Sequence, residues 1–114
     1  MKKLIEIVKV EAPVQASANM DYSSKITIKN NVYSPLVFRY DHTVNGKTTR
    51  HFGFIRAKKT ITLPIKTRAE DIGTEYHELS IKFFLIFQDK TEWYVEIVEE
   101  APSAEIIQTE FSAI

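Results

Sequence analysis

The 114-residue sequence predicts an all-β fold, an antiparallel sandwich of two sheets with seven or eight strands. Three observations support this prediction. Apolar and polar residues alternate at period two along most of the chain, as they do in half-buried strands. The dipeptide Asn45-Gly46 stands between two such runs and is typical of a tight hairpin turn. No segment carries a convincing 3.6-residue apolar repeat of an amphipathic helix.

The length predicts a single domain, residues 1–114, with one two-layer core. With 44% hydrophobic and 26% charged residues, the composition is that of an ordinary soluble globular protein. The chain has no cysteine, which excludes disulfides and thiolate chemistry and fits a reducing compartment. Glu6 and Lys9 interrupt the apolar run at the amino terminus before it reaches the length of a signal peptide. We therefore expect a cytoplasmic chain, with an excised domain or a virion component as alternatives.

The first two predicted strands cover residues 3–11 and 22–29. In the first strand, the apolar alternation slips by one residue between Ile7 and Val8. Such a slip indicates a β-bulge or a strand that crosses from one sheet to the other. The second strand alternates regularly, as expected for a strand with one buried face.

Residues 36–44 and 47–56 form the predicted hairpin around Asn45-Gly46. Both central positions of a two-residue turn need positive φ, which Asn and Gly tolerate. The turn also sets the register of the two strands. It pairs Val44 with Lys47, His42 with Thr49, Asp41 with Arg50, and Tyr40 with His51.

Residues 59–67 alternate with Ile61, Leu63 and Ile65 inward and Pro64 on the opposite face. Proline cannot donate a hydrogen bond to a sheet, so this strand is predicted to lie at an edge or to have its proline at an unpaired position.

Tyr76 to Gln88 is the longest strand-like run, and its second half is apolar on both faces. A strand with one solvent-exposed face would not carry apolar residues on both faces. We therefore predict a central strand with Phe83 and Leu85 in the core. Residues 88–91 are predicted to turn the chain into a strand over 92–100, where Trp93 faces inward. Residues 103–111 form a possible last strand.

Gly73-Thr74-Glu75-Tyr76 precedes this predicted central strand. This run and the order of the strands resemble the immunoglobulin-like superfamily, in its fibronectin type III and bacterial cell-adhesion-related branches. In that family a Gly-Thr-x-Tyr run places a tyrosine at the corner before the sixth strand, where its hydroxyl bonds back to the backbone. The resemblance implies an immunoglobulin-like sandwich with Tyr76 as a structural corner tyrosine. A fold alone implies no function.

Few residues suggest chemistry. His42 and His51 are diagonal neighbours in the predicted hairpin, roughly 7 Å apart, and could share a metal. Two ligands alone make a weak metal site. The favoured interpretation is that both are ordinary surface or half-buried histidines. The chain has three glycines and therefore no phosphate-binding loop, and none of its serines lies in a Gly-x-Ser-x-Gly elbow. We predict no enzyme and no cofactor.

The charges are strongly segregated along the sequence. Residues 42–69 contain seven basic residues and no acidic one, whereas residues 70–114 contain eleven acidic residues and two basic ones. The net charge of zero thus hides a segment at +7 and a segment at −9. The candidate binding residues are the cations of the hairpin and the connection after it: Lys47, Arg50, Arg56, Lys58 and Lys59.

These observations favour a non-enzymatic protein-interaction or structural module. It would act through a sheet edge or its charge-polar surface and bind a protein partner or a second copy. One alternative is an anion or nucleic-acid binder that uses the cations of 47–59, with Tyr40, Phe52 and Phe54 for stacking. The acidic half would repel phosphate, so this alternative is less favoured. Another is a carbohydrate-binding sandwich with Trp93 or Tyr94 as its platform. We expect no membrane partner.

Overall fold

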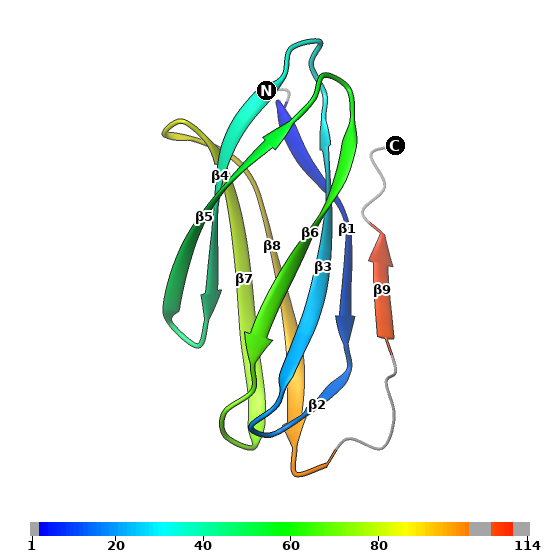
Figure 1. Cartoon of the computed structure of the whole chain (residues 1–114), viewed down its shortest axis with the longest axis vertical. Coiled ribbons are helices and arrows are strands. Elements are labelled where there is room, and N and C mark those ends of the chain that lie inside the picture. The colour runs from blue at the N-terminus through cyan, green and yellow to red at the C-terminus, as the bar shows by residue number, and fades with distance from the viewer. Residues whose placement is uncertain (1–2, 101–105, 111–114) are drawn as a thin grey trace.

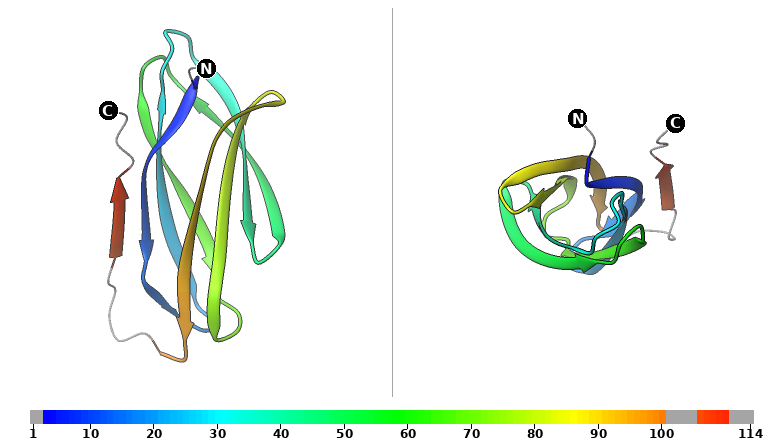
Figure 2. Two further views of the ribbon diagram at one scale, coloured as in Figure 1. Left: turned by 180° about the vertical axis from the view of Figure 1, so that it is seen from behind. Right: turned by 90° about the horizontal axis from the view of Figure 1, so that it is seen from above.

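Two facing sheets make up the protein in a computed structural model that describes residues 3–100 and 106–110 (Figures 1 and 2). One sheet has the strand order β6-β3-β1-β9 and the other β2-β8-β7-β4-β5. The strands are β1 (Ile5–Pro13), β2 (Gln15–Ser17), β3 (Asp21–Asn30), β4 (Leu36–Val44), β5 (Lys47–Ile55), β6 (Thr60–Arg68), β7 (Gly73–Phe83), β8 (Ile86–Val98) and β9 (Ile106–Glu110). The predicted immunoglobulin-like sandwich is confirmed.

The slip in the first strand is a bulge, one of the two predicted alternatives. The register of β1 against β3 shifts between Ile7 and Lys9, which is a bulge. After Pro13 the chain then crosses to the other sheet, where β2 pairs in parallel with β8. β1 and β2 are parts of one segment that changes sheets. If they are counted as one strand, the protein has the predicted eight strands instead of nine.

The hairpin of β4 and β5 has the predicted register at every pair named above. Asn45 and Gly46 have φ values of 46° and 88°, as a tight turn with two positive φ angles requires. The turn is also tied to β7: Asn45 Oδ1 accepts a hydrogen bond from the Tyr76 N–H at 3.0 Å, and the Asn45 N–H donates to the Tyr76 carbonyl at 3.1 Å. The turn thereby positions β4 against β7.

The core lies between the sheets and is built from the inward residues of each strand. Ile26 and Ile28 of β3 are fully buried, and Leu79 and Ile81 of β7 face them from the other sheet. Trp93 is 7% exposed, in agreement with the predicted structural role, and Phe83 packs partly buried against the core.

The predicted central strand over Tyr76–Gln88 is wrong in its second half. β7 does lie in the middle of the five-stranded sheet, but it ends at Phe83, and the chain reverses at Phe84 and Leu85 into β8. Leu85 is 85% exposed and is therefore not a core residue. The predicted turn over 88–91 lies inside β8. The turn at Phe84 and Leu85 was not predicted because it contains no Gly, Pro, Asn or Asp, the residues that usually indicate a turn. Its apolar residues also continue the pattern of the strand.

Tyr76 is not a corner tyrosine. Its ring lies on the outer face of the sheet, 5.1 Å from the ring of Tyr94. Desolvation and a hydrogen bond to Glu92 raise the pKa of Tyr76 to about 12. Strand alternation explains the difference: Glu75 and His77 of β7 point into the sandwich, so Tyr76 between them points out.

Phe84→Asn is expected to raise the free energy of unfolding by up to about 1 kcal/mol. Phe84 has a φ of 55°, a left-handed backbone conformation that a bulky residue rarely adopts and asparagine adopts readily. Its side chain is 76% exposed, so its removal opens no cavity. Urea unfolding followed through Trp93 fluorescence measures the change. Leu85→Asn is the matched control, because Leu85 has no positive φ to relieve. A lower stability of Phe84→Asn would show that the phenyl ring itself supports the fold.

Candidate interaction surface

β5 forms a free edge of the five-stranded sheet. Among the described residues it pairs with β4 alone, and seven of its nine residues are exposed. The edge of the other sheet, β6, is different because Pro64 interrupts its row of donors, as predicted. Proline on an edge strand blocks pairing with further strands, and β5 contains no proline. β5 is therefore the long edge that remains open to a further strand.

The turn decides which backbone groups of β5 are open. In an antiparallel pair closed by a two-residue turn, hydrogen-bonded pairs alternate with non-bonded pairs, starting from Val44 and Lys47. The N–H and C=O groups that point away from β4 then belong to Thr48, Arg50, Phe52 and Phe54. The side chains of these same four residues point to the outer face of the sheet.

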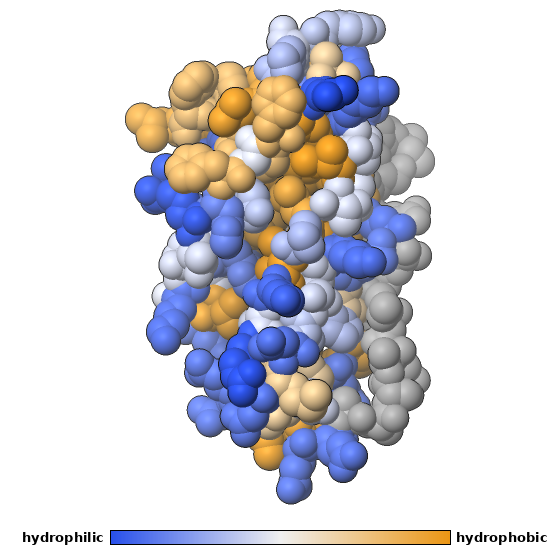
Figure 3. Space-filling model, in the orientation of Figure 1, coloured by the Kyte–Doolittle hydropathy of each residue, from blue (hydrophilic) through white to orange (hydrophobic). Residues whose placement is uncertain are grey.

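Exposed apolar side chains accompany this edge. Phe52 is 71% exposed, Phe54 is 56% exposed, and Val37, which pairs with Phe54 across the hairpin, is 61% exposed. Figure 3 shows apolar surface gathered at the upper left of the molecule, over the β7–β8 hairpin and the adjoining end of β5. A contiguous exposed apolar surface of this kind is typical of an interaction site.

The five candidate cations all lie at this edge or in the connection after it, and all are exposed. They form two groups rather than one patch, because the nine residues of β5 at about 3.3 Å each separate Lys47 from Arg56 by about 30 Å. Arg50 is already paired, with its Nε 3.3 Å from Asp41 Oδ1. Lys58 Nζ lies 4.6 Å from the centroid of the Tyr33 ring.

The predicted charge asymmetry has a structural counterpart. Basic β5 lies at one edge of the five-stranded sheet, and acidic β8 lies next to the other edge. On the outer face of β7 and β8, Lys90 Nζ lies 3.3 Å from Glu78 and 3.4 Å from Glu92.

A polar chain that the sequence analysis did not predict crosses the core between the sheets. The Tyr22 hydroxyl of β3 lies 2.5 Å from Glu75 Oε1 and 2.6 Å from His77 Nε2. His77 Nδ1 in turn lies 2.9 Å from His42 Nε2. One proton assignment satisfies every contact: His42 donates to His77, His77 donates to Tyr22, and Tyr22 donates to Glu75. Both imidazoles are neutral in this arrangement.

Burial explains the titration of this chain. His77 is 0% exposed and His42 is 5% exposed, and the Trp93 ring stacks against both at 5.0 and 5.8 Å. Loss of solvation lowers the pKa of each histidine to about 4, and burial followed by the neighbouring Glu75 raises the pKa of Tyr22. His42, Glu75 and His77 are buried in the core, and Tyr22 is half-buried. We therefore assign them a structural role.

His42 and His51 do not form a metal site. They lie on one face of the hairpin as predicted, but His42 is buried against His77, whereas His51 is exposed and stacks on Tyr40 at 5.0 Å. The structure shows no group of three or more His, Cys, Asp or Glu side chains suited to a metal within the part of the chain that it describes.

The carbohydrate alternative loses one of its two platforms, because Trp93 is buried. Tyr94 remains 63% exposed, beside Tyr76. The interior position of Glu75 was not predicted. Glu75 and His77 share the inward phase of Leu79 and Ile81, and this period-two signal could have identified them.

No protein-family model and no curated protein sequence matches the chain. Solved structures with the same fold include the CARDB domain of the PF1109 protein from Pyrococcus furiosus. Its crystal structure in complex with di-metal ions has a TM-score of 0.72 and 11% identity, over 88% of this chain and 99% of that chain. Its solution NMR structure has a TM-score of 0.70 and 12% identity, over 88% and 100%. At these identities the likeness shows that the chain has the immunoglobulin-like fold of these domains.

Proposed function

We propose that the domain is a non-enzymatic protein-interaction module that binds an extended segment of a partner protein along β5. The observation that carries the proposal is the free edge of β5, whose outward backbone groups belong to residues with exposed side chains. An added strand gains backbone hydrogen bonds along such an edge, and alternate side chains give specificity. The likeness to CARDB domains supports the sandwich fold that presents this edge.

The side chains around the edge define the chemistry of the segment. Phe52 and Phe54 would pack against apolar residues of the added strand, and Lys47 and Arg56 would favour acidic ones. Pairing of β5 with the β5 of a second copy is disfavoured, because it brings two basic strands together and like charges directly opposite each other are destabilising. The proposed ligand is therefore a segment that alternates apolar and acidic residues.

A nucleic-acid ligand is the second candidate, and Phe52 and Phe54 are available to stack with bases. The division of the cations into two groups and the ion pair of Arg50 with Asp41 weaken this candidate. Binding of a single-stranded oligonucleotide at low salt, and loss of that binding in Arg56→Glu/Lys59→Glu, would favour it over the protein ligand.

Selection of a displayed random peptide library against the domain is expected to enrich acidic, apolar peptides without proline. Arg50→Pro should abolish their binding, because it removes an outward N–H donor while leaving the bonds between β4 and β5 in place. Arg50→Ala is the matched control for loss of the charge and should retain most of the binding. Amide exchange of the complex should show new protection at Thr48, Phe52 and Phe54.

The proposal fails if no peptide is enriched or if the enriched peptides bind Arg50→Pro as well as the wild type. A stability of Arg50→Pro close to that of the wild type confirms that the strand is intact in this comparison.

A further inference from the structure

The β7–β8 hairpin ends in four consecutive apolar residues that lie largely in solvent. Phe84 is 76% exposed, Leu85 85%, Ile86 59% and Phe87 56%. Figures 1 and 2 show this hairpin projecting sideways from the body of the sandwich, near the end that also holds the β3–β4 and β5–β6 connections. Tyr33, in the β3–β4 connection, is 86% exposed. A contiguous group of exposed apolar side chains is typical of a site that contacts a protein or a membrane.

The same end of the sandwich is strongly basic. We define the tip end as residues 3–7, 29–39, 52–62 and 80–89. These are the parts of the strands nearest the β7–β8 turn, together with the connections between them. Within it, seven basic and two acidic residues give a net charge of +5. The basic residues are Lys3, Lys29, Arg39, Arg56, Lys58, Lys59 and Lys82.

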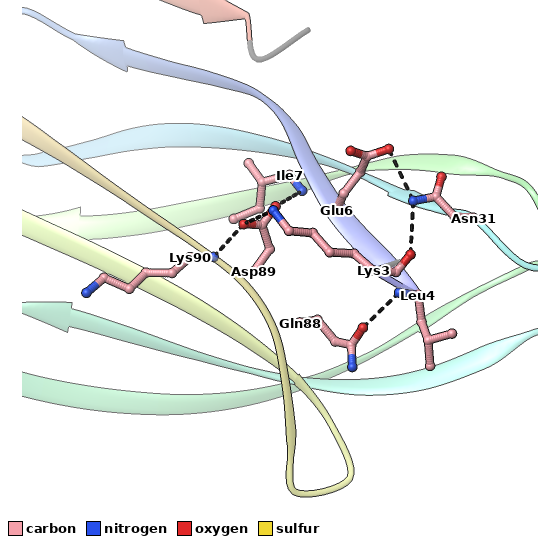
Figure 4. Close-up of polar contacts among 8 residues, drawn as sticks. All are labelled: Lys3, Leu4, Glu6, Ile7, Asn31, Gln88, Asp89 and Lys90. Atoms are coloured by element: carbon pink, nitrogen blue, oxygen red, sulfur yellow. Dashed lines mark hydrogen bonds and ion pairs between the residues drawn. The ribbon is translucent and has the colours of Figure 1, made fainter. Parts of the chain in front are cut away.

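Both acidic side chains of the tip end are already engaged (Figure 4). Asp89 accepts hydrogen bonds from the N–H groups of Ile7 and Lys90 at 2.8 and 2.9 Å, and from Lys3 Nζ at 3.0 Å. Glu6 accepts from Asn31 Nδ2 at 3.1 Å. By contrast, Arg56, Lys59 and Lys82 form no ion pair with any residue that the structure describes. Arg39 is paired with Asp41 at 3.7 Å, and Glu6 keeps its negative charge because an amide does not neutralise a carboxylate. The charge around the apolar turn is therefore predominantly, though not exclusively, positive.

The opposite end has the opposite charge. The remaining residues of the range 3–100 contain seven basic and eleven acidic residues, a net charge of −4. The longest extent of the molecule is 46 Å, whereas electrostatic screening at physiological salt acts over about 8 Å. The acidic end thus does not cancel the field at the tip end, and a negatively charged surface would orient the molecule with the tip end toward it.

We infer that the tip end docks on an anionic lipid bilayer, with Phe84, Leu85, Ile86 and Phe87 inserted at the boundary between headgroups and acyl chains. The cations around the turn contact the lipid phosphates and carboxylates, an attraction of the kind that holds polybasic segments on anionic leaflets. No helix among the described residues is long and apolar enough to cross a membrane. This inference departs from the expectation of no membrane partner.

A lipid surface fits this end better than a protein partner does. Protein interfaces surround an apolar centre with a rim of polar groups of mixed character. Here the apolar turn has no polar side chain among its four residues, and the charge around it is predominantly positive. An anionic bilayer supplies an apolar interior and a negative surface at once.

Co-sedimentation with phosphatidylcholine vesicles that contain phosphatidylserine tests the inference, with pure phosphatidylcholine vesicles beside them. We expect binding to the anionic vesicles that falls with rising salt. Arg56→Glu/Lys59→Glu should weaken it about tenfold or more, because each cation near the surface contributes about a fivefold factor. Lys66→Glu/Arg68→Glu is the matched control, with the same residue types and charge change at the opposite end, and should bind as the wild type does.

Insertion of the turn has its own readout. The chain has no cysteine, so Leu85→Cys can carry a single environment-sensitive dye. We expect its emission to shift to the blue with anionic vesicles, whereas the dye on Ile72→Cys, which is 66% exposed before β7, should not respond. Phe84→Asn should lose vesicle binding although it folds at least as stably as the wild type.

Three results would overturn the inference: no sedimentation of the wild type with either vesicle at low salt, equal binding to both vesicle compositions, or equal losses in the two charge variants. If the turn binds a protein partner instead, Phe84→Asn should lose binding to the selected peptides and the wild type should not bind vesicles. That result would also overturn the inference. Arg50→Pro should keep full vesicle binding, so the failure of either proposal can be recognised separately.

Discussion

Phe38→Ala is expected to lower the free energy of unfolding by about 3 to 5 kcal/mol, as measured by urea denaturation. Phe38 is 1% exposed and is among the largest fully buried side chains of the described core. Its ring lies over Gly53 of the neighbouring strand and 5.9 Å from the ring of Tyr40. Truncation therefore leaves a cavity between the sheets that the rigid hairpin cannot collapse to fill.

Gly53 provides a second test of the same contact. A Cβ at this position would come within 2.9 Å of two Phe38 ring atoms and closer still to Cζ. Gly53→Ala should therefore destabilise the protein, and Phe38→Leu/Gly53→Ala should cost less than the sum of the two single changes. Phe52→Ala is the matched control, since its ring is 71% exposed, and should change stability by no more than about 0.5 kcal/mol. A loss below about 1 kcal/mol for Phe38→Ala would contradict the packing described above.

The free energy of unfolding is expected to fall as the pH is lowered from about 6.5 to about 4, by about 3 kcal/mol for each of the two buried histidines. Burial lowers the pKa of His42 and His77 in the folded protein to about 4, whereas the unfolded chain binds these protons near pH 6.5. The unfolded state therefore binds more protons in this window. The stabilisation is fully present above pH 6.5 and is lost as the pH falls toward 4.

Denaturation measured at several pH values tests this expectation. His51→Gln should keep the full slope, because His51 is exposed, and His42→Gln should reduce it. Glu75, whose Oε1 lies 3.8 Å from His77 Nε2, is the carboxylate that faces the pair. An unchanged free energy of unfolding between pH 6.5 and pH 4 would contradict this expectation. It would show that the two histidines bind protons in the folded protein as readily as in the unfolded chain.

Features determined by neighbours in the sequence were predictable from the sequence alone. The register of β4 and β5 followed from Asn45-Gly46, because the dihedral angles of a two-residue turn leave one way to pair the strands. The bulge in β1 followed from a phase slip, and the edge position of β6 followed from Pro64, which cannot donate to a sheet. The two-sheet sandwich itself followed from period-two alternation without a helical repeat.

Only the tertiary structure decided the features that depend on strands distant in the sequence. Phe84 turns the chain despite an unfavourable φ, and a run of apolar residues looks the same whether it is buried in a strand or exposed at a turn. The chain from Glu75 through Tyr22 and His77 to His42 joins three strands of two sheets, so no local pattern reveals it. The basic tip end likewise arises because antiparallel strands bring separate segments to one end of the sandwich, where their charges add. The sequence therefore determined the strands and their local turns, and the packing of the two sheets determined which polar groups are buried and which apolar groups meet the solvent.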